Sequence, residues 1–522
     1  MYNRRAFNKH CIESEAVFLK LAKRVHINTK LIQEELNHSS DLIIHNFILT
    51  LPHRRELTGA MIYIEGMASG QLVTDAVLQP ILHEMRDYDQ PIDANILKFL
   101  AESVLTASEV TETDQLDDTL LSIMVGKVAL LIDGFNTALT IDVKGWDYRA
   151  IQSPQTEAVI RGPRDSFIEV LNRNIMLIRR RLRDPNLVIE YVRVGERGQN
   201  DLAIAYIKDI AQPDLVQEVR KRLEKVNLDV ILDSGYVEQI IEDDWWSPFN
   251  TIQDTERPDE VAAALVEGRV AILVDNTPFA LLVPTTLNAQ MMSPEDYYVR
   301  WAAANFIRVI RFLASFISFV TPSLYIALVS YHPEMFPTQL ALSVAASREG
   351  IPFPAFVEAL VMEISLELLR EAGIRLPGPI GQTIGIVGGL IIGEAAVNAS
   401  IVSPIMVIVV ALTAIAGFII PTYNLSFGIR ITRFFLMLAA SFLGLYGLSL
   451  ALLIVLGHLA TLTSFGVSYL SPWAPFNWPD FRDSIIRAPW HVLKNRPSYT
   501  NPIDSTRQPT QKNKSNKRKQ QS

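Results

Sequence analysis

The pattern of apolar and polar positions divides the chain of 522 residues into two parts. Up to about residue 300, short apolar runs alternate with charged stretches, as in a globular α/β protein. From about residue 312 to 470 the apolar runs are long, and between Gly378 and Ile429 the only charged side chain is Glu394. Runs of this length are typical of segments inside a bilayer. We therefore expect duplicated cytoplasmic α/β lobes followed by an α-helical, multi-span membrane domain.

Shifts in composition predict five parts. They are an N-terminal tail (1–30), a first α/β lobe (31–155), a second lobe that repeats it (156–295), a transmembrane domain (300–470) and a basic, partly disordered cytoplasmic tail (471–522). About four to six spans are expected, including 312–331, 383–401, 404–421 and 434–457. Segments 355–371 and 458–470 are left open, the latter as a candidate half-helix. Arginines before the first span predict a cytoplasmic start, namely Arg300, Arg308 and Arg311.

Two segments of the first part match at a nearly constant spacing. The stretch 117–139 resembles the stretch 259–281, so that Gly126 aligns with Gly268, 142 residues later. Tyrosines further upstream, Tyr63 and Tyr206, keep this offset to within one residue. A match maintained over this distance indicates a duplicated unit. In both copies the glycine is expected to end a helix in the left-handed conformation.

The strand that follows each glycine ends in an aspartate at a predicted hairpin turn. Asp133-Gly134 is a strong hairpin signal, and in the second copy Asn276 follows Asp275 and also tolerates a positive φ. The two aspartates should therefore occupy the same position in two copies of one fold. Turn chemistry explains them better than catalysis does.

The chemistry of the lobes gives no catalytic signature. No phosphate-binding glycine loop, dinucleotide fingerprint or zinc-protease motif occurs in the sequence. The single cysteine, Cys11, allows neither an intramolecular disulfide nor a cysteine-rich zinc site. The net charge of −8 argues against nucleic acid as a partner. We therefore expect no cofactor, no metal and no enzymatic activity.

Small residues recur at every fourth position of the apolar part. Gly381, Gly385, Gly389 and Gly393 would form one stripe on a helix, which allows another backbone to approach closely. The prediction is that this stripe packs helices together, either within one chain or between copies. The alternative is that the helix is rotated and the glycines face a pore.

A second stripe on the same helix alternates polar and apolar side chains. It contains Thr383, Val387, Leu390, Glu394 and Asn398. An intramembrane carboxylate usually faces a water-filled path, although a protonated, hydrogen-bonded glutamate in a packed helix is the alternative. On the first interpretation, rings of Val387 and Leu390 gate a pore by dewetting and Glu394 favours cations.

The stretch 355–371 predicts an amphipathic helix with acidic residues on both of its sides. Glu363, Glu367 and Glu371 share the polar side, whereas Glu358 falls in the middle of the apolar side. A buried acid at Glu358 is costly unless it is paired or hydrated. We therefore expect Glu358 to be functionally sensitive and Glu371 to be tolerant of substitution.

Six motifs carry a resemblance to a known family. They are T-E-R-P-D-E-V (255–261), D-N-T-P-F-A-L-L-V-P (275–284), S-P-E-D-Y-Y (293–298), H-P-E-M-F-P-T-Q-L (332–340), S-R-E-G-I-P-F-P-A-F-V-E-A-L (347–360) and L-P-G-P-I-G-Q-T-I-G-I-V-G-G-L-I-I-G-E-A-A-V (376–397). With them, the chain resembles the A subunits of GerA-type nutrient germinant receptors of bacterial endospores. The resemblance covers roughly residues 150–490 strongly and the first lobe less specifically.

The resemblance implies a function in spore germination. It implies a multi-pass protein of the spore inner membrane that acts with a transporter-like B subunit and a lipoprotein C subunit. It also implies a homo-oligomer, in contact with membrane lipid, that forms an ion-conducting path opened by nutrient. One alternative is a secondary transporter or transport-associated membrane protein, although no inverted repeat is visible. Another is a membrane-bound enzyme, for which Glu363 with His332 is a poor candidate pair.

Overall fold

The first of two five-stranded sheets is antiparallel in every pairing. A computed structural model describes residues 20–52, 55–88, 95–107, 109–144, 153–154, 156–375, 388–389 and 391–508. In this sheet Leu42 lies opposite Ile64, and Val128 lies opposite Ile141. The strand order is β1-β2-β4-β5-β3, with β1 at Leu42–Leu51, β2 at Arg55–Ile64, β3 at Val110–Thr113, β4 at Val128–Ile132 and β5 at Ala138–Ile141.

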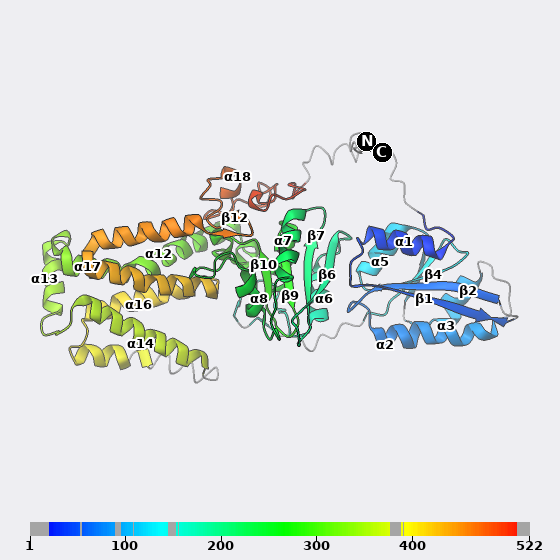
Figure 1. The fold of residues 1–522 in the computed structure, drawn as a ribbon, viewed down its shortest axis with the longest axis horizontal. Coiled ribbons are helices and arrows are strands. Elements are labelled where there is room, and N and C mark those ends of the chain that lie inside the picture. The colour runs from blue at the N-terminus through cyan, green and yellow to red at the C-terminus, as the bar shows by residue number, and fades with distance from the viewer. Residues whose placement is uncertain are drawn as a thin grey trace. The chain divides into compact units, whose positions relative to one another are not determined.

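Helices cover both faces of this first sheet (Figure 1). The α-helices are α1 (Val25–Glu35), α2 (Gly70–Leu72), α3 (Gln79–Glu84), α4 (Asn95–Phe99) and α5 (Leu116–Met124). Shorter turns of other helix types join them, at η2 (Val73–Leu78), η3 (Met85–Asp87) and η4 (Leu100–Val104). Every residue of β4 and β5 is buried, which explains why β4 is wholly apolar and β5 is apolar except for Thr140.

The second sheet repeats this strand order as β6-β7-β9-β10-β8. Its strands are β6 (Leu187–Val194), β7 (Asn200–Ile207), β8 (Gln253–Thr255), β9 (Val270–Val274) and β10 (Ala280–Val283). The helices of this region are α6 (Leu171–Arg181), α7 (Pro213–Leu223), α8 (Ser234–Ile241), α9 (Pro258–Val266), α10 (Leu287–Gln290) and α11 (Glu295–Tyr298). The common order supports the duplication inferred from the sequence.

The two hairpin turns also share their backbone details. Gly134 and Asn276 have φ values of +94° and +68°, and each follows the aspartate that ends its strand. The amide of Gly134 donates to the carbonyl of Lys23 at 2.7 Å, just before α1. The amide of Asn276 donates to the carbonyl of Glu169 at 2.8 Å, just before α6. Asp133 and Asp275 therefore hold the same position in the two copies, as the sequence predicts.

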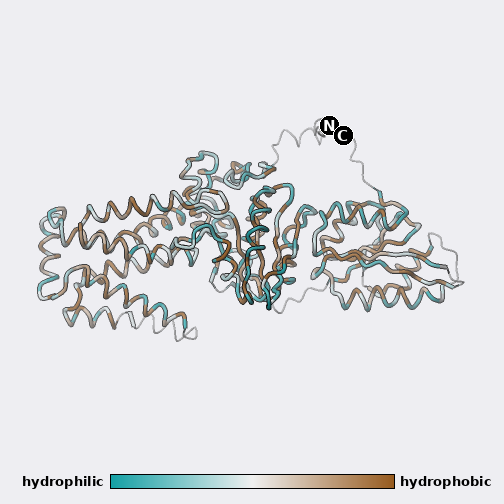
Figure 2. Tube along the Cα trace, viewed as in Figure 1, coloured by the Kyte–Doolittle hydropathy of each residue, from teal (hydrophilic) through white to brown (hydrophobic). Residues whose placement is uncertain are grey.

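Grouped by spatial proximity, the chain falls into two compact units. One comprises residues 1–151, 170–192 and 201–208, and the other comprises 152–169, 193–200 and 209–522. The helical domain and the segment after it belong wholly to the second unit. Figure 2 shows the hydrophobic residues that run along its helices.

The helical domain is built around one apolar core. Its helices are α12 (Trp301–Tyr331), α13 (Thr338–Ser347), α14 (Ala355–Arg375), α16 (Pro404–Phe418) and α17 (Tyr423–Thr461), with a short turn η6 at Pro333–Met335. Residues 391–398 are also helical. The core contains side chains from α12, α14, α16 and α17, among them Ile326, Ala359, Met406 and Met437.

Two helices in the described part of the chain are long and apolar enough to cross a membrane. They are α12 and α17, each of which contains an 18-residue window with a mean hydropathy of 1.9 and 2.2, respectively. α12 continues through Pro322, where the sequence predicts a kink or a break. The predicted span 312–331 lies within α12. The predicted span 404–421 contains α16, an apolar helix of 15 residues that is shorter than a span, and the span 383–401 lies partly outside the described residues.

α17 folds back on itself at Gly444, whose φ of +59° and ψ of −136° are not helical. A Cβ atom on Gly447 would lie 2.1 Å from the carbonyl oxygen of Ala439. The two arms of α17, which are its parts before and after Gly444, must therefore lie against each other. The segments at both ends of α17 return to α10: the hydroxyl of Thr422 donates to the Gln290 carbonyl at 2.6 Å, and that of Tyr469 donates to the Gln290 side chain at 3.2 Å. The predicted single span 434–457 is therefore wrong, because the chain reverses within it.

The segment after α17 differs from the sequence-based expectation. The segment 458–470, which the sequence left open, does not form the candidate half-helix: α17 ends at Thr461, and a hairpin of β11 (Thr463–Ser464) and β12 (Val467–Ser468) follows. Within the predicted tail, residues 471–508 form turns, α18 (Trp478–Phe481) and η7 (Ser498–Thr500). The hydroxyl of Thr500 donates to the carbonyl of Glu267 at 2.7 Å, which fixes this segment on the second lobe.

Candidate functional site

The glycine stripe lies partly in the described chain. Gly393 is buried, and a Cβ atom there would lie 3.5 Å from Val407 of α16. Gly389 has open space around it among the described residues. Gly388, which the sequence analysis does not single out, comes closest to another helix, since a Cβ atom there would lie 2.8 Å from Leu369 of α14. Two members of the stripe, Gly381 and Gly385, lie outside the described residues.

The polar stripe lies on a different side of the same segment. Glu394 and Asn398 are both exposed on the surface of the chain. Thr383, Val387 and Leu390 lie outside the described residues. The segment thus packs through Gly393 and presents its carboxylate and amide outward.

Glu358, which the sequence places on the apolar side of its helix and which needs either a partner or water there, lies beside a charged partner. The side chain of Glu358 is 0% exposed, and one of its oxygens lies 3.0 Å from Nη2 of Arg348. The other oxygen accepts from the backbone amide of Ser403 at 2.8 Å. Ser403 is the N-cap residue of α16, so the carboxylate also lies at the positive end of that helix. Glu358 therefore joins the start of α14 to the start of α16.

The remaining acidic side of α14 faces α17 and pairs with its arginines. Glu363 lies 2.7 Å from Arg433, and both side chains are almost fully buried. Glu367 lies 2.9 Å from Arg430 and 2.8 Å from Arg370. Removing one partner of such a buried pair leaves an uncompensated charge, which usually costs about 3–5 kcal/mol.

These ion pairs change the interpretation of two sequence signals. Arg430 and Arg433, which precede the predicted span 434–457, pair with acids of α14. The pair Glu363 and His332, considered for an enzyme, is not formed, since Glu363 binds Arg433 and His332 contacts the carbonyl of Ala327. The sequence does contain a signal for this pairing. Glu363 and Glu367 are four residues apart on α14, and Arg430 and Arg433 are three residues apart on α17, so each pair lies on one side of its helix.

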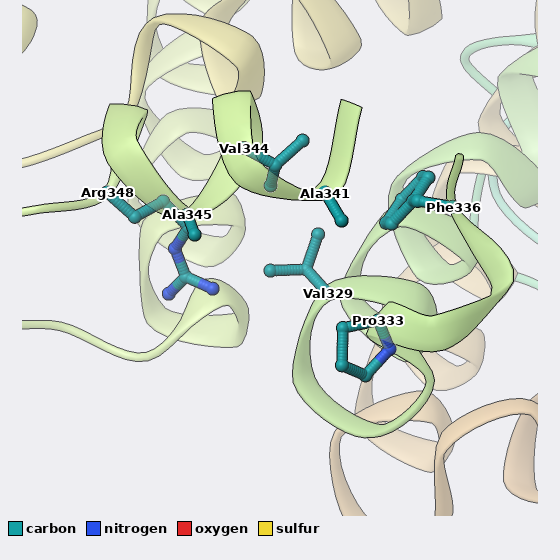
Figure 3. Close-up of a pocket in the computed structure, with 7 residues that line it drawn as sticks. All are labelled: Val329, Pro333, Phe336, Ala341, Val344, Ala345 and Arg348. Carbon is teal, nitrogen blue, oxygen red and sulfur yellow. The ribbon is translucent and has the colours of Figure 1, made fainter. Parts of the chain in front are cut away.

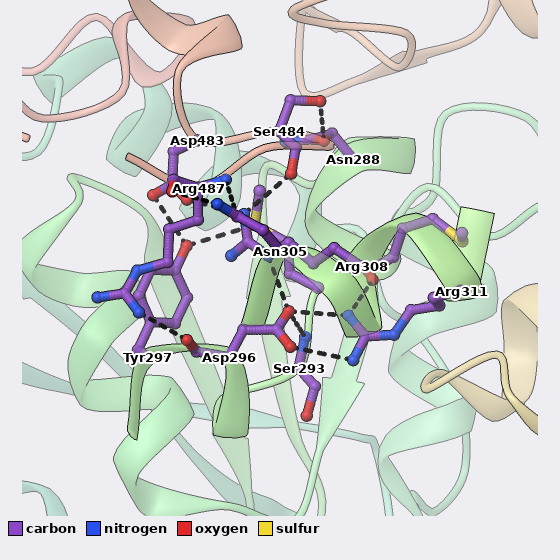
Figure 4. A network of polar contacts seen from close by, with 12 residues as sticks. Asn288, Ser293, Asp296, Tyr297, Asn305, Arg308, Arg311, Asp483, Ser484 and Arg487 are labelled. Atoms are coloured by element: carbon purple, nitrogen blue, oxygen red, sulfur yellow. Dashed lines mark hydrogen bonds and ion pairs between the residues drawn. The ribbon is translucent and has the colours of Figure 1, made fainter. Parts of the chain in front are cut away.

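A second polar network fixes the start of α12 (Figure 4). Asp296 accepts from Arg308 at 3.0 Å and from Arg311 at 2.8 and 3.1 Å. Arg308 also donates to Asp483 at 2.9 Å, and Arg487 donates to the backbone carbonyl of Asp296 at 2.8 Å. Arg308 and Arg311 are both buried. Arg308 joins α12 to the C-terminal segment, whereas Arg311 joins α12 to Asp296 of α11 and to the carbonyl of Met291. Of the three arginines from which the sequence predicts a cytoplasmic start, only Arg300 is exposed.

The second lobe contacts α17 next to a group of buried carboxyls. Asn424, in the first turn of α17, donates to Asp254 at 2.8 Å. The hydroxyl of the neighbouring Thr255 donates to Glu157 at 2.6 Å and lies 3.2 Å from Glu260. Burial raises the pKa of Glu157, with Glu260 adding to it, and burial raises the pKa of Glu260 to about 7. Among the described residues, no group of carboxylates and histidines is arranged to hold a metal ion.

Comparison with known proteins decides the family. Residues 30–499 match the family model described as Bacillus/Clostridium GerA spore germination protein. The chain belongs to the GerA family. The match covers both sheets and the whole helical domain, which is more than the resemblance noted from motifs alone.

Individual relatives within the GerA family are similar over nearly their whole length. The spore germination protein GerLA of Bacillus cereus is 41% identical over 92% of this chain and 97% of its own. The uncharacterized membrane protein YfkQ of Bacillus subtilis is 43% identical over 84% of this chain and 85% of its own. A solved structure is also similar: the crystal structure of the N-terminal domain of the A subunit of the Bacillus megaterium spore germinant receptor GerK3. Its sequence is 35% identical to this chain, and the match covers 51% of this chain and 96% of that one, with a TM-score of 0.41. Family membership gives the chain a role in spore germination.

Proposed function

We propose that this GerA-family chain is the A subunit of a nutrient germinant receptor in the spore inner membrane. In this proposal its helical domain forms, in an oligomer, an ion-conducting path that opens when nutrient binds. The lobes lie on the cytoplasmic side, and a transporter-like B subunit and a lipoprotein C subunit complete the receptor. The relatives' names and the family support the receptor assignment.

The observation that carries the conducting path is the exposure of Glu394 on an apolar segment. Gly393 packs against α16, while Glu394 and Asn398 point away from the bundle. A charge that faces lipid at the centre of a bilayer costs about 2.5–3.5 kcal/mol on insertion scales. Water or a second copy of the chain must therefore cover this face. A ring of such faces would form a hydrated path with carboxylates along it.

The arrangement of helices fits a domain with several spans. α14 has 21 residues, and at about 1.5 Å per residue it is as long as the hydrocarbon core is thick. The two arms of α17, 423–443 and 445–461, fall within the roughly 17–25 residues that a span needs. The pair of Glu363 and Arg433 between α14 and α17 is almost fully buried inside the bundle, whereas Glu367 of the neighbouring pair is 31% exposed.

Ion release from spores tests the path. We expect Glu394→Gln to reduce nutrient-triggered cation release several-fold, while Glu371→Gln, on an exposed side chain paired with Arg375, leaves it unchanged. In the apolar rings, Val387→Ala and Leu390→Ala should release ions without nutrient, because a wider constriction stays wet. Receptor levels are measured by immunoblot in each strain, so that loss of assembly is not mistaken for loss of conduction.

Two outcomes would contradict this assignment. If Val387→Ala and Leu390→Ala are silent while Gly385→Ala or Gly389→Ala leaks, the glycine stripe faces the path instead. If the purified protein in a bilayer shows stoichiometric uptake in place of steady ion current, the protein is a transporter. Gly389→Leu, a packing variant, is expected to lower the amount of assembled complex.

A further inference from the structure

A cavity lies at the C-terminal end of α12, beneath α13 (Figure 3). It has a volume of about 300 Å³, at the lower end of the range for small-molecule sites. Six of its seven lining residues are apolar, and the seventh is an arginine: Val329, Pro333, Phe336, Ala341, Val344, Ala345 and Arg348. A predominantly apolar wall with a single, localised polar group is the composition of sites that bind small organic molecules.

The polar group of the cavity is only partly used. Nη2 of Arg348 lies 3.0 Å from the carboxylate of Glu358 and donates to the carbonyl of Phe353 at 3.3 Å. Its Nε is buried and has no hydrogen-bond partner among the described residues. A guanidinium offers five donors in a planar fork that matches a carboxylate. Figure 3 shows this guanidinium beside Ala345, and because the arginine side chain is 20% exposed, a ligand in the cavity can contact the exposed part of it.

The same arginine connects the cavity to the core of the bundle. Glu358, which Arg348 holds, accepts from the amide of Ser403 at the start of α16. The side chain of Ser403 lies 3.5 Å from the hydroxyl of Tyr325 on α12. An acceptor bound at Arg348 would compete with Glu358 for the guanidinium. Occupation of the cavity is thereby coupled to the contact between α14 and α16.

We propose that this cavity binds a small molecule with an aliphatic body and a carboxylate, and that the carboxylate pairs with Arg348. A volume of about 300 Å³, at the lower end of the range for small-molecule sites, sets the limit at a small ligand. A short-chain carboxylate fits this limit, and a membrane fatty acid exceeds it. The proposal does not depend on ion conduction, because binding is measured on the purified protein.

The experiment uses the full chain in nanodiscs of phosphatidylcholine, with empty nanodiscs as the blank. Saturation-transfer NMR titrations compare hexanoate, hexanol and hexadecanoate as probes. Ala341→Leu places three further carbons in the cavity, and Val329→Phe fills it from the opposite wall. Ala346→Leu is the matched control, since this exposed residue of α13 does not line the cavity. Gel filtration and thermal unfolding check that each variant is folded.

Hexanoate is expected to bind saturably and about tenfold more tightly than hexanol. Both cavity-filling variants should weaken hexanoate binding by about tenfold or more, while Ala346→Leu leaves it unchanged. The proposal is overturned if hexanoate fails to saturate, if hexanol binds as tightly, or if Ala341→Leu and Ala346→Leu behave alike. It is also overturned if hexadecanoate binds as tightly as hexanoate, since the cavity could not then be setting the size of the ligand.

Discussion

The two arms of α17 approach each other closely at the backbone. Gly447 is buried, and a Cβ atom there would lie 2.1 Å from the carbonyl oxygen of Ala439 and 2.9 Å from the Cβ of Leu443. Real Cβ atoms do not approach a backbone oxygen this closely, so Gly447→Ala must push the arms apart. Gly457 lies in the second arm and is exposed, and a Cβ atom there would have no neighbour within 4 Å among the described residues. The same substitution therefore has opposite consequences at two positions of one helix.

The magnitudes follow from two opposing terms. Alanine is about 1 kcal/mol better than glycine inside a helix, so Gly457→Ala should be neutral or stabilising by up to that amount. At Gly447 this gain is outweighed, because overpacking a filled interface typically costs about 1–3 kcal/mol and the obstacle here is backbone. Gly447→Ala should therefore lower the stability of the protein by up to about 2 kcal/mol.

The unfolding temperature of both variants is measured on detergent-purified protein, with loss of the monodisperse gel-filtration peak as the signal for unfolding. Limited proteolysis near Gly444, the turn between the arms, reports their separation directly. Gly447→Ala should unfold at a lower temperature than the unchanged protein, and Gly457→Ala at the same or a higher one. Equal behaviour of the two variants would refute the close packing of the arms.

Two further predictions concern carboxylates. Glu358→Gln should lower stability by about 3–5 kcal/mol, because Arg348 then loses its buried partner. Glu371→Gln on the surface should change stability by less than about 0.5 kcal/mol. Equal shifts of the unfolding temperature in the two variants would contradict the ion pair. Burial, with Asp254 adding to it, raises the pKa of Glu238 to about 8 from an ordinary 4.5. The folded state therefore holds a proton that the unfolded state loses, and stability should fall as pH rises from about 4.5 to about 8. Glu238→Gln should remove part of that fall. The variant and the unchanged protein should differ in their free energy of unfolding by about 1–3 kcal/mol at pH 8.5 and by almost nothing at pH 4.5. Parallel profiles of stability against pH for the two proteins would refute the assignment.

Local signals in the sequence were sufficient to predict the lobes. The glycines that end α5 and α9 and the turns at Gly134 and Asn276 take the positive φ values that their residue types favour. The matched offset predicted two copies of one unit, and the two sheets have the same strand order. These features succeed because turn chemistry and strand burial depend on neighbours in the chain.

Hydropathy also identified the helical domain, but it did not show the paths of its helices. A run such as 434–457 is equally apolar whether it is one straight span or two arms. The reversal occurs at Gly444, where a Cβ atom would lie 2.8 Å from Tyr331 and 2.9 Å from His332. In the same way, the sequence placed acids on one side of α14 and arginines before a span, without showing that they pair.

The candidate sites show the same division between local and long-range information. Helical periodicity alone predicted that Glu358 is buried and needs a partner, since the phase of a helix is a local property. Its partners, Arg348 and the amide of Ser403, come from other segments and could be known only once α14 and α16 were placed. The cavity beside Arg348 has no sequence signature, because its walls belong to α12, η6 and α13 and enclose a space only when these elements meet in the tertiary structure.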